Sequence, residues 1–341
     1  MGARVRCSTG PVEWSAGTIV ALWYREEHWP PGRTAPYQVR LDDDTLIFAP
    51  ADDDGLVRAE ATFEKLLSEE TQAAERKSAA YRTDVVERYQ RRHSALFETD
   101  ELPRFLDPNL HAVLEAGGDV SSLWRKEASG LYSVPMVTEE FCRLLLEECE
   151  HFEAWCAAEG IALHRPNTMN NHGAIIDDFG MDRMMDALMR RCVEPLAHAA
   201  GFADVVGSGC TFRSHHAFLV SYAMGKDLDL SFHVDSSDAT LNVCLGKDFE
   251  GGELFFRGVR CRAHQQTGCR DAEAVTYTHR PGVAILHRGL HRHGAHRITS
   301  GERHNLILWC RGEPAASSQG CHARLKECQP WCWMHDDGAT L

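Results

Sequence analysis

The chain contains no run of apolar residues long enough to cross a lipid bilayer. Its start, Met1 to Cys7, lacks the apolar centre of a secretory signal peptide. An arginine stands at position 6, where an N-myristoylation signal requires serine or threonine. We therefore expect an intracellular protein, cytoplasmic or nuclear, with no membrane partner.

Regularly spaced cysteine pairs are also lacking. The 13 cysteines form an odd and scattered set, which argues against a disulfide framework and favours the reduced thiols of the cytosol or nucleus. The densest group lies near the C-terminal end and consists of Cys321, Cys328, Cys332 and His335. Its spacing departs from the close pairs of common zinc sites, so free thiols are favoured over a structural zinc ion.

Basic residues are outnumbered, with 36 Lys and Arg against 50 Asp and Glu, and the net charge is −14. An acidic field repels phosphates, so nucleic acid is not favoured as a partner. Internal repeats are absent. At 341 residues the chain exceeds one comfortable core, and we expect one main domain with appendages.

Short apolar runs dominate the C-terminal half and are separated by turn signals such as Pro281-Gly282. Many short strands at close spacing are typical of a sandwich or jelly roll, whose two sheets enclose a small cavity. The runs that we predict as strands are 239–245, 252–256, 275–277, 282–286 and 305–309.

A histidine and an aspartate stand two residues apart at the start of this region. His233 and Asp235 point to the same face of a strand, so they can bind one ion side by side. Such a pair is a weak signal in a chain with 19 histidines. One more imidazole would complete a 2-His-1-carboxylate facial triad, which leaves open positions on Fe(II). The candidates form a cluster further on: His287, His291, His293 and His296.

Ordered motifs surround these residues. They are 222–225 (YAMG), 233–235 (HVD), 251–255 (GGELF), 281–284 (PGVA) and 293–303 (HGAHRITSGER), and upstream 130–135, 141–145 and 165–171 (RPNTMNN). Together they resemble the 2-oxoglutarate- and Fe(II)-dependent oxygenases of the prolyl/lysyl hydroxylase type, in particular the 2-oxoglutarate and iron-dependent oxygenase domain-containing proteins. The resemblance covers roughly residues 131–311, a span typical of one domain.

The resemblance implies His293 as the third metal ligand, because the family places that ligand about ten residues before a cosubstrate arginine and closes the motif with Gly-x-Arg. His291 is the alternative, two residues away and on the same face of a regular strand. The implied metal ligands are therefore His233, Asp235 and His293.

The cosubstrate residues are also implied by the resemblance. Arg303 would bind the distal carboxylate of 2-oxoglutarate through its rigid fork of donors, although it could instead pair with an acidic neighbour such as Glu302. Tyr222 would add a hydroxyl donor, although a buried tyrosine is often only core. Asn242 and Trp309 are further candidates, because they fall on predicted strands near the ligands.

The expected fold is α+β, a double-stranded β-helix (jelly roll) oxygenase core with supporting helices. The resemblance implies a dioxygenase that uses Fe(II), 2-oxoglutarate and O2, with ascorbate as a candidate reductant, and releases succinate and CO2. A protein or peptide partner is expected, hydroxylated on a prolyl or lysyl side chain. The alternatives are a nucleobase or small-molecule hydroxylase, a cupin-like metal protein, and a non-catalytic jelly-roll binding module.

The first sixty residues form a separate pattern, in which the runs 5–7, 17–24, 37–41 and 46–48 are predicted strands of a small SH3-like β-barrel. Its aromatic residues form either the barrel core or an aromatic cage for a methylated lysine. The expected division is 1–60 barrel, 61–130 helical linker, 131–312 oxygenase domain and 313–341 Cys-rich tail. The cage candidates are Trp14, Trp23, Tyr24, Trp29 and Tyr37.

Three helices are predicted. An amphipathic helix spans 59–90, with Phe63, Leu66 and Leu67 among its apolar residues at helical spacing. A second begins after the cap Thr138 and ends at Gly160, and a third spans 182–200 with an interruption at Pro195. We expect these helices to pack on one face of the barrel and to carry no chemistry.

Overall fold

A computed structural model describes the chain except for residues 11–12, 203–210, 261–263 and 313–341. The described chain divides into two compact units, residues 1–81 and 82–341. The division falls inside the long helix α1 (Glu60–Arg88). The four-part division predicted from the sequence stays a prediction, and the candidate zinc residues Cys321, Cys328, Cys332 and His335 lie outside the described residues.

The N-terminal unit contains a five-stranded antiparallel sheet in the order β4-β3-β2-β1-β5. Alternate residues of β1 and β3, including Val5, Cys7, Val39 and Leu41, are buried in a common apolar cluster. The four predicted strands are confirmed, and the sequence did not predict β5. Closure into an SH3-like barrel stays a prediction. The strands are β1 (Arg4–Ser8), β2 (Trp14–Tyr24), β3 (Ala35–Leu41), β4 (Leu46–Ala49) and β5 (Val57–Ala59).

The five cage candidates do not gather in one place. Tyr24 and Trp29 pack against Phe48, with ring centroids 6.5 and 4.8 Å from it. Trp14 packs instead against Phe63, and Trp23 is 71% exposed. Trp29, which is buried against Phe48, is therefore part of the apolar core and not of a cage.

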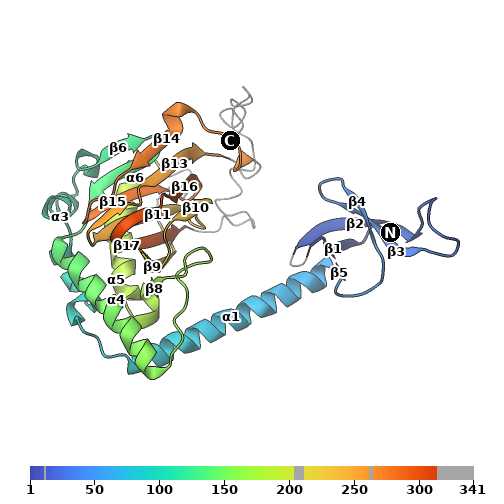
Figure 1. Ribbon diagram of the computed structural model, residues 1–341, viewed down its shortest axis with the longest axis horizontal. Coiled ribbons are helices and arrows are strands. Elements are labelled where there is room, and N and C mark those ends of the chain that lie inside the picture. Colours follow the sequence, from blue (N-terminus) through green and yellow to red (C-terminus); the bar gives the residue numbers. More distant parts are fainter. Residues whose placement is uncertain (11–12, 203–210, 261–263, 313–341) are drawn as a thin grey trace. The chain divides into compact units, whose positions relative to one another are not determined.

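The second unit is built on two antiparallel sheets (Figure 1). The larger, eight-stranded sheet has the order β6-β7-β15-β11-β17-β9-β8, with β12 paired to β17, and the smaller, four-stranded sheet has the order β10-β16-β13-β14. The larger sheet contains β6 (Arg125–Ala128), β7 (Leu131–Pro135), β8 (Gly173–Ile175), β9 (Ser214–Ala223), β11 (Ala239–Gly246), β12 (Phe249–Gly251), β15 (Val283–Arg288) and β17 (Ile298–Arg311). The smaller contains β10 (Leu230–His233), β13 (Leu254–Val259), β14 (Ala274–Tyr277) and β16 (His291–Ala295).

From β9 onward the chain alternates between the two sheets. It passes from β9 to β10, returns to β11, crosses to β13 and β14, returns to β15, crosses to β16 and ends in β17. This alternation is that of a jelly roll, as predicted. The five strands predicted in this region are confirmed as β11, β13, β14, β15 and β17. Their ends differ by at most three residues, except that β17 begins at Ile298, well before the predicted start at 305.

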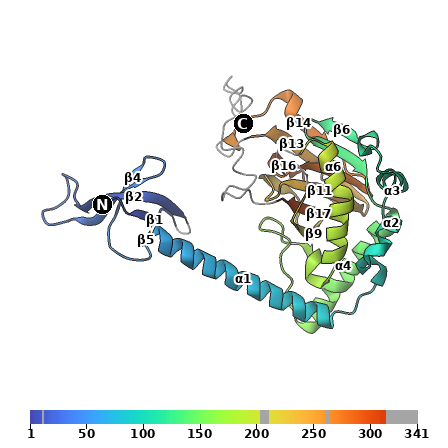
Figure 2. The same cartoon turned by 180° about the vertical axis from the view of Figure 1, so that it is seen from behind.

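Helices cover the outer face of the larger sheet, where α4 packs against β11 and α5 against β9 (Figures 1 and 2). In α4 (Glu139–Glu159) the Thr138 side chain accepts a hydrogen bond from the backbone N–H of Phe141, and Gly160 ends the helix at φ +66°. Both predicted ends are confirmed. The predicted third helix is α5 (Asp182–Leu188), a π-helical turn, η5 (Met189–Val193), and α6 (Glu194–Ala199), which begins around Pro195.

The first predicted helix is present as α1, and Phe63 of its expected apolar stripe packs against Trp14, but the burial expected of the other two members is wrong. Leu66 and Leu67 are 37% and 53% exposed, and Val85 is the buried residue of this helix. The remaining short elements are η1 (Ser94–Phe97), η2 (Thr99–Glu101), α2 (Leu102–Phe105), α3 (Pro108–Glu115), η3 (Val120–Ser122), η4 (Ile176–Phe179) and η7 (Asp271–Glu273). Within the described residues, no helix combines the length and apolar character that a membrane span needs.

Candidate active site

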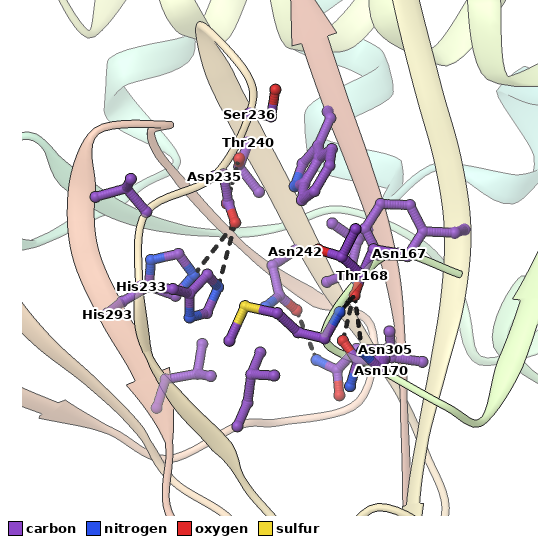
Figure 3. A pocket seen from close by; sticks show the side chains of 18 of the residues that line it. Asn167, Thr168, Asn170, His233, Asp235, Ser236, Thr240, Asn242, His293 and Asn305 are labelled. Atoms are coloured by element: carbon purple, nitrogen blue, oxygen red, sulfur yellow. Dashed lines mark hydrogen bonds and ion pairs between the residues drawn. The ribbon is translucent and has the colours of Figure 1, made fainter. Parts of the chain in front are cut away.

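The smaller sheet brings His233, Asp235 and His293 together (Figure 3). His233 ends β10 and is paired in register with His293 of β16. Asp235 follows two residues later, and its Oδ1 lies 3.4 Å from His233 Nε2 and 3.7 Å from His293 Nε2. One ligand atom from each residue lies within 4.8 Å of the other two.

Backbone carbonyls orient both imidazoles. His233 Nδ1–H donates to the carbonyl of Ser231 at 2.7 Å, and His293 Nδ1–H donates to the carbonyl of His291 at 2.8 Å. A neutral imidazole carries one proton, so both Nε2 atoms present a lone pair beside Asp235. This arrangement is typical of histidines that bind a metal.

A hydroxyl group fixes the carboxylate of Asp235. Thr240 Oγ1 donates to Asp235 Oδ2 at 2.7 Å, and the Ser237 hydroxyl lies 2.7 Å from Thr240 Oγ1. The backbone N–H of Asp235 donates to the carbonyl of Gly289 at 2.8 Å. Oδ2 is therefore occupied, and Oδ1 remains free to face the imidazoles.

Electrostatics favour the metal-binding protonation states of Asp235 and His293, but not that of His233. Burial opposes ionisation of Asp235, but the imidazoles of His293 and His233 outweigh it and hold the pKa of the carboxyl well below its usual value. Burial holds the pKa of His293 well below its usual value. Burial also lowers the pKa of His233, although the Asp235 carboxylate makes the net shift upward. A carboxylate and a neutral imidazole are the forms that bind metals.

The donor set fits a small divalent cation. Ligand bonds of about 2.1 Å at right angles place neighbouring donor atoms about 3 Å apart. Each imidazole Nε2, 3.4 or 3.7 Å from Asp235 Oδ1, therefore needs to approach that oxygen by less than about 1 Å. His291, the alternative ligand, is outside the group. It pairs with Val259 of β13 and packs against Phe256, with ring centroids 5.2 Å apart.

Arg303 lies in the same cavity on β17 and is 1% exposed. Its Nη1 donates to the carbonyl of Gly252, its guanidinium lies 4.2 Å from the centroid of the Tyr222 ring, and its Nε has no hydrogen-bond partner. Among the described residues no carboxylate forms an ion pair with it, Glu302 included. A buried, uncompensated guanidinium calls for an anionic ligand.

The cavity has a volume of about 150 Å³. Of the predicted cosubstrate residues, Arg303, Tyr222, Asn242 and Trp309 all line it, and they come from the larger sheet. Asn242 Oδ1 accepts a hydrogen bond from Asn305 Nδ2 at 2.6 Å, and Trp309 Nε1 is buried without a partner.

The sequence did not single out Asn305, Asn167 and Asn170, which also line the cavity. The period of two along β17 was a usable signal for Asn305, because Arg303, Asn305, Ile307 and Trp309 share one face. No signal placed the loop residues Asn167 and Asn170 there. The other lining residues are Thr168, Met169, Phe218, Val220, Leu230, His233, Val234, Asp235, Ser236, Thr240, Leu254 and His293.

Comparisons with known proteins define the class. Residues 85–207 match the OGFOD2-like domain family. The chain is 41% identical over 253 residues to the Arabidopsis thaliana 2-oxoglutarate and iron-dependent oxygenase domain-containing protein CP2, and this match covers 74% of the chain and 63% of that protein. The match to the human 2-oxoglutarate and iron-dependent oxygenase domain-containing protein 2 has 35% identity and covers 75% of the chain and 74% of that protein.

A more distant relative is the rat multifunctional procollagen lysine hydroxylase and glycosyltransferase LH3, which is 27% identical over 58% of the chain and 26% of its own length. The chain thus spans less than two thirds of the Arabidopsis relative. Its match to the human protein is long enough to assign the family. The chain belongs to the 2-oxoglutarate and iron-dependent oxygenase domain-containing proteins.

Proposed function

We propose that this protein is an Fe(II)- and 2-oxoglutarate-dependent dioxygenase that hydroxylates a C–H bond. One observation carries the proposal: a single cavity holds the group His233, Asp235 and His293 at one part of its wall and the buried, uncompensated Arg303 at another. These are the two anchors that a metal-chelating dicarboxylate needs.

In this proposal His233, Asp235 and His293 would hold Fe(II), as a 2-His-1-carboxylate ligand set does. Bound iron supplies the redox chemistry, in which O2 and 2-oxoglutarate give succinate and CO2 while a substrate C–H bond becomes an alcohol. Arg303 pairs with the distal carboxylate of 2-oxoglutarate, and the Tyr222 hydroxyl donates a hydrogen bond to the same group. Asn242 and Trp309 complete the polar wall.

We infer a protein substrate, hydroxylated on a prolyl or lysyl side chain, from the motifs of the prolyl/lysyl hydroxylase type and from the LH3 relative. Ascorbate is the proposed reductant. A cytoplasmic or nuclear location is supported by the free thiols of the eight described cysteines.

Two structural assignments belong to the same proposal. Residues 1–60 form an SH3-like barrel, supported by the strand order β5-β1-β2-β3-β4, and residues 131–312 form the oxygenase domain, with 61–130 as linker and 313–341 as tail.

The direct test measures succinate from 2-oxoglutarate in the presence of Fe(II), ascorbate and O2, together with anaerobic binding of 2-oxoglutarate to the Mn(II)-loaded protein. We expect both turnover and metal-dependent binding. A folded protein that binds Mn(II) but no 2-oxoglutarate would contradict the assignment, and a cupin-like metal site would then be preferred. Mass spectrometry of treated peptides, seeking a gain of one oxygen atom, identifies the substrate.

A further inference from the structure

The motif at residues 165–171 has no role in the function proposed above. In the structure this segment is the loop between α4 and β8. Asn167, Thr168, Met169 and Asn170 line the cavity (Figure 3). Asn170 is 1% exposed, which is unusual for an amide side chain in a loop.

The loop is attached to β9, the strand that carries Tyr222. At one end His216 Nε2 donates to the carbonyl of Pro166 at 3.0 Å, and at the other the N–H of Ser221 donates to the carbonyl of His172 at 3.1 Å. Gly173 follows at φ +130°, where an added Cβ would lie 1.9 Å from the carbonyl oxygen of Leu219. Attachment at both ends makes the loop a fixed wall of the cavity.

A chain of side-chain amides runs through this wall, and its direction is determined. Backbone N–H groups can only donate, so the atom of Asn167 that accepts from the N–H groups of Met169 and Asn170, both at 2.8 Å, is the oxygen. The Asn167 nitrogen must then donate to Asn170 Oδ1, at 3.0 Å. This leaves Asn170 Nδ2 as the donor to Tyr222 Oη, at 3.1 Å.

The last hydrogen bond of this amide series, from Asn170 to Tyr222, sets the direction of the Tyr222 hydroxyl. Because its oxygen accepts from Asn170, its own proton must point elsewhere, and none of the described residues accepts it. The ring of Tyr222 lies beside the Arg303 guanidinium, 4.2 Å from its centroid. Two donors, the Tyr222 O–H and the unpartnered Arg303 Nε–H, are thus available to the same anion.

We propose that Asn167 and Asn170 are positioning residues for the cosubstrate: their amide chain holds Tyr222 as a hydrogen-bond donor to the distal carboxylate of 2-oxoglutarate. This inference rests on the proposed function. It also gives the RPNTMNN motif a chemical reason. An amide at both positions is required because each must accept on one side and donate on the other, which neither a carboxylate nor an aliphatic side chain does.

Asn167→Asp tests the direction of the chain without opening a cavity. The new carboxylate still accepts both backbone N–H groups but cannot donate to Asn170. The Asn170 amide then turns its nitrogen to this carboxylate and its oxygen to Tyr222, which draws the hydroxyl proton away from the ligand. We expect about tenfold weaker binding of 2-oxoglutarate, the value of one hydrogen bond to a charged group. Asn170→Asp, which places an acceptor directly beside Tyr222, should weaken binding at least as much.

The measurement is anaerobic calorimetric titration of the Mn(II)-loaded full-length variants with 2-oxoglutarate, with Mn(II) affinity determined separately. Asn171→Ala is the matched control, since Asn171 does not line the cavity and bonds to Asp227, and we expect binding within about twofold of wild type. Tyr222→Phe removes the hydroxyl, and in that background Asn167→Asp should cause no further loss.

The outcomes separate this inference from the proposed function. Absence of 2-oxoglutarate binding in the wild type contradicts the proposed function itself. Wild-type binding that is unchanged by Asn167→Asp and Asn170→Asp overturns the positioning role alone. A loss that persists in full in the Tyr222→Phe background, or that is accompanied by an equal loss of Mn(II) affinity, shows that the amides merely hold the loop, and also overturns it.

Discussion

Replacing Thr240 by valine removes one hydroxyl group behind the proposed metal ligands and almost no volume. Thr240 and Asp235 are 1% and 4% exposed, and the hydroxyl donates to Asp235 Oδ2 at 2.7 Å. Because an ionised carboxylate only accepts, Ser237 must donate to Thr240 in turn. Without the hydroxyl, Oδ2 loses its buried donor, and Asp235 can rotate or bind the metal through both oxygens.

Loss of a group that orients a metal ligand lowers metal affinity about 10- to 100-fold, or roughly 1.4 to 2.7 kcal/mol. We expect Thr240→Val to weaken Mn(II) binding by this amount, measured anaerobically by the electron paramagnetic resonance signal of free Mn(II). Thr240→Ser should restore most of the affinity. Thr276→Val, the same change at an exposed position of β14, should leave it unaltered. Wild-type affinity in Thr240→Val would refute the reasoning.

Four further outcomes are expected. Asp235→Ala should abolish stoichiometric iron, measured by plasma spectrometry, while the circular dichroism of the fold is retained. Arg303→Leu should raise the Michaelis constant for 2-oxoglutarate at least about thirtyfold with little change in iron affinity, since one partner of a buried charge pair is lost; unchanged succinate production at low 2-oxoglutarate would contradict its role. Burial opposes ionisation of Glu273, but hydrogen bonds from Arg260 outweigh it and lower its pKa to about 2. This lowered pKa stabilises the folded state fully above the unfolded pKa of about 4.5, and the contribution is lost as the pH falls towards 2. In Glu273→Gln, the free energy of unfolding measured with urea should therefore depend less on pH over that interval. A protein that begins after Arg58 should still decarboxylate 2-oxoglutarate, and loss of that turnover would show that the N-terminal unit is needed for chemistry.

Much of the fold could be predicted because its signals are local. The helix from Thr138 to Gly160 has a side-chain cap at one end and a left-handed glycine at the other, and both act within one turn. The apolar run 239–245 became β11, buried along its whole length. The choice between His291 and His293 could not be made from periodicity, because both lie on one strand and its pairing with His233 distinguishes them.

The amide chain shows where such prediction ends. Asn170 and Tyr222 are 52 residues apart in the sequence, and their contact depends on how the loop before β8 is attached to β9. The exposure of Leu66 and Leu67 is a second example, since their spacing is that of a helix face with a partner, yet the described part of α1 buries little more than Val85. Spacing reports which residues share a face and not whether another element covers it.

The cavity wall is divided between the sheets: His233 and His293 belong to the smaller sheet, whereas Arg303, Tyr222 and Asn242 belong to the larger one. In the proposed function, a single small molecule ties the two layers of the sandwich together, with one carboxylate at each. Its binding would then stabilise the folded sandwich. A free 2-oxoglutarate concentration of 100 times the dissociation constant would add about 2.7 kcal/mol to the free energy of unfolding. Binding of 2-oxoglutarate would thereby stabilise the folded protein as well as support its turnover.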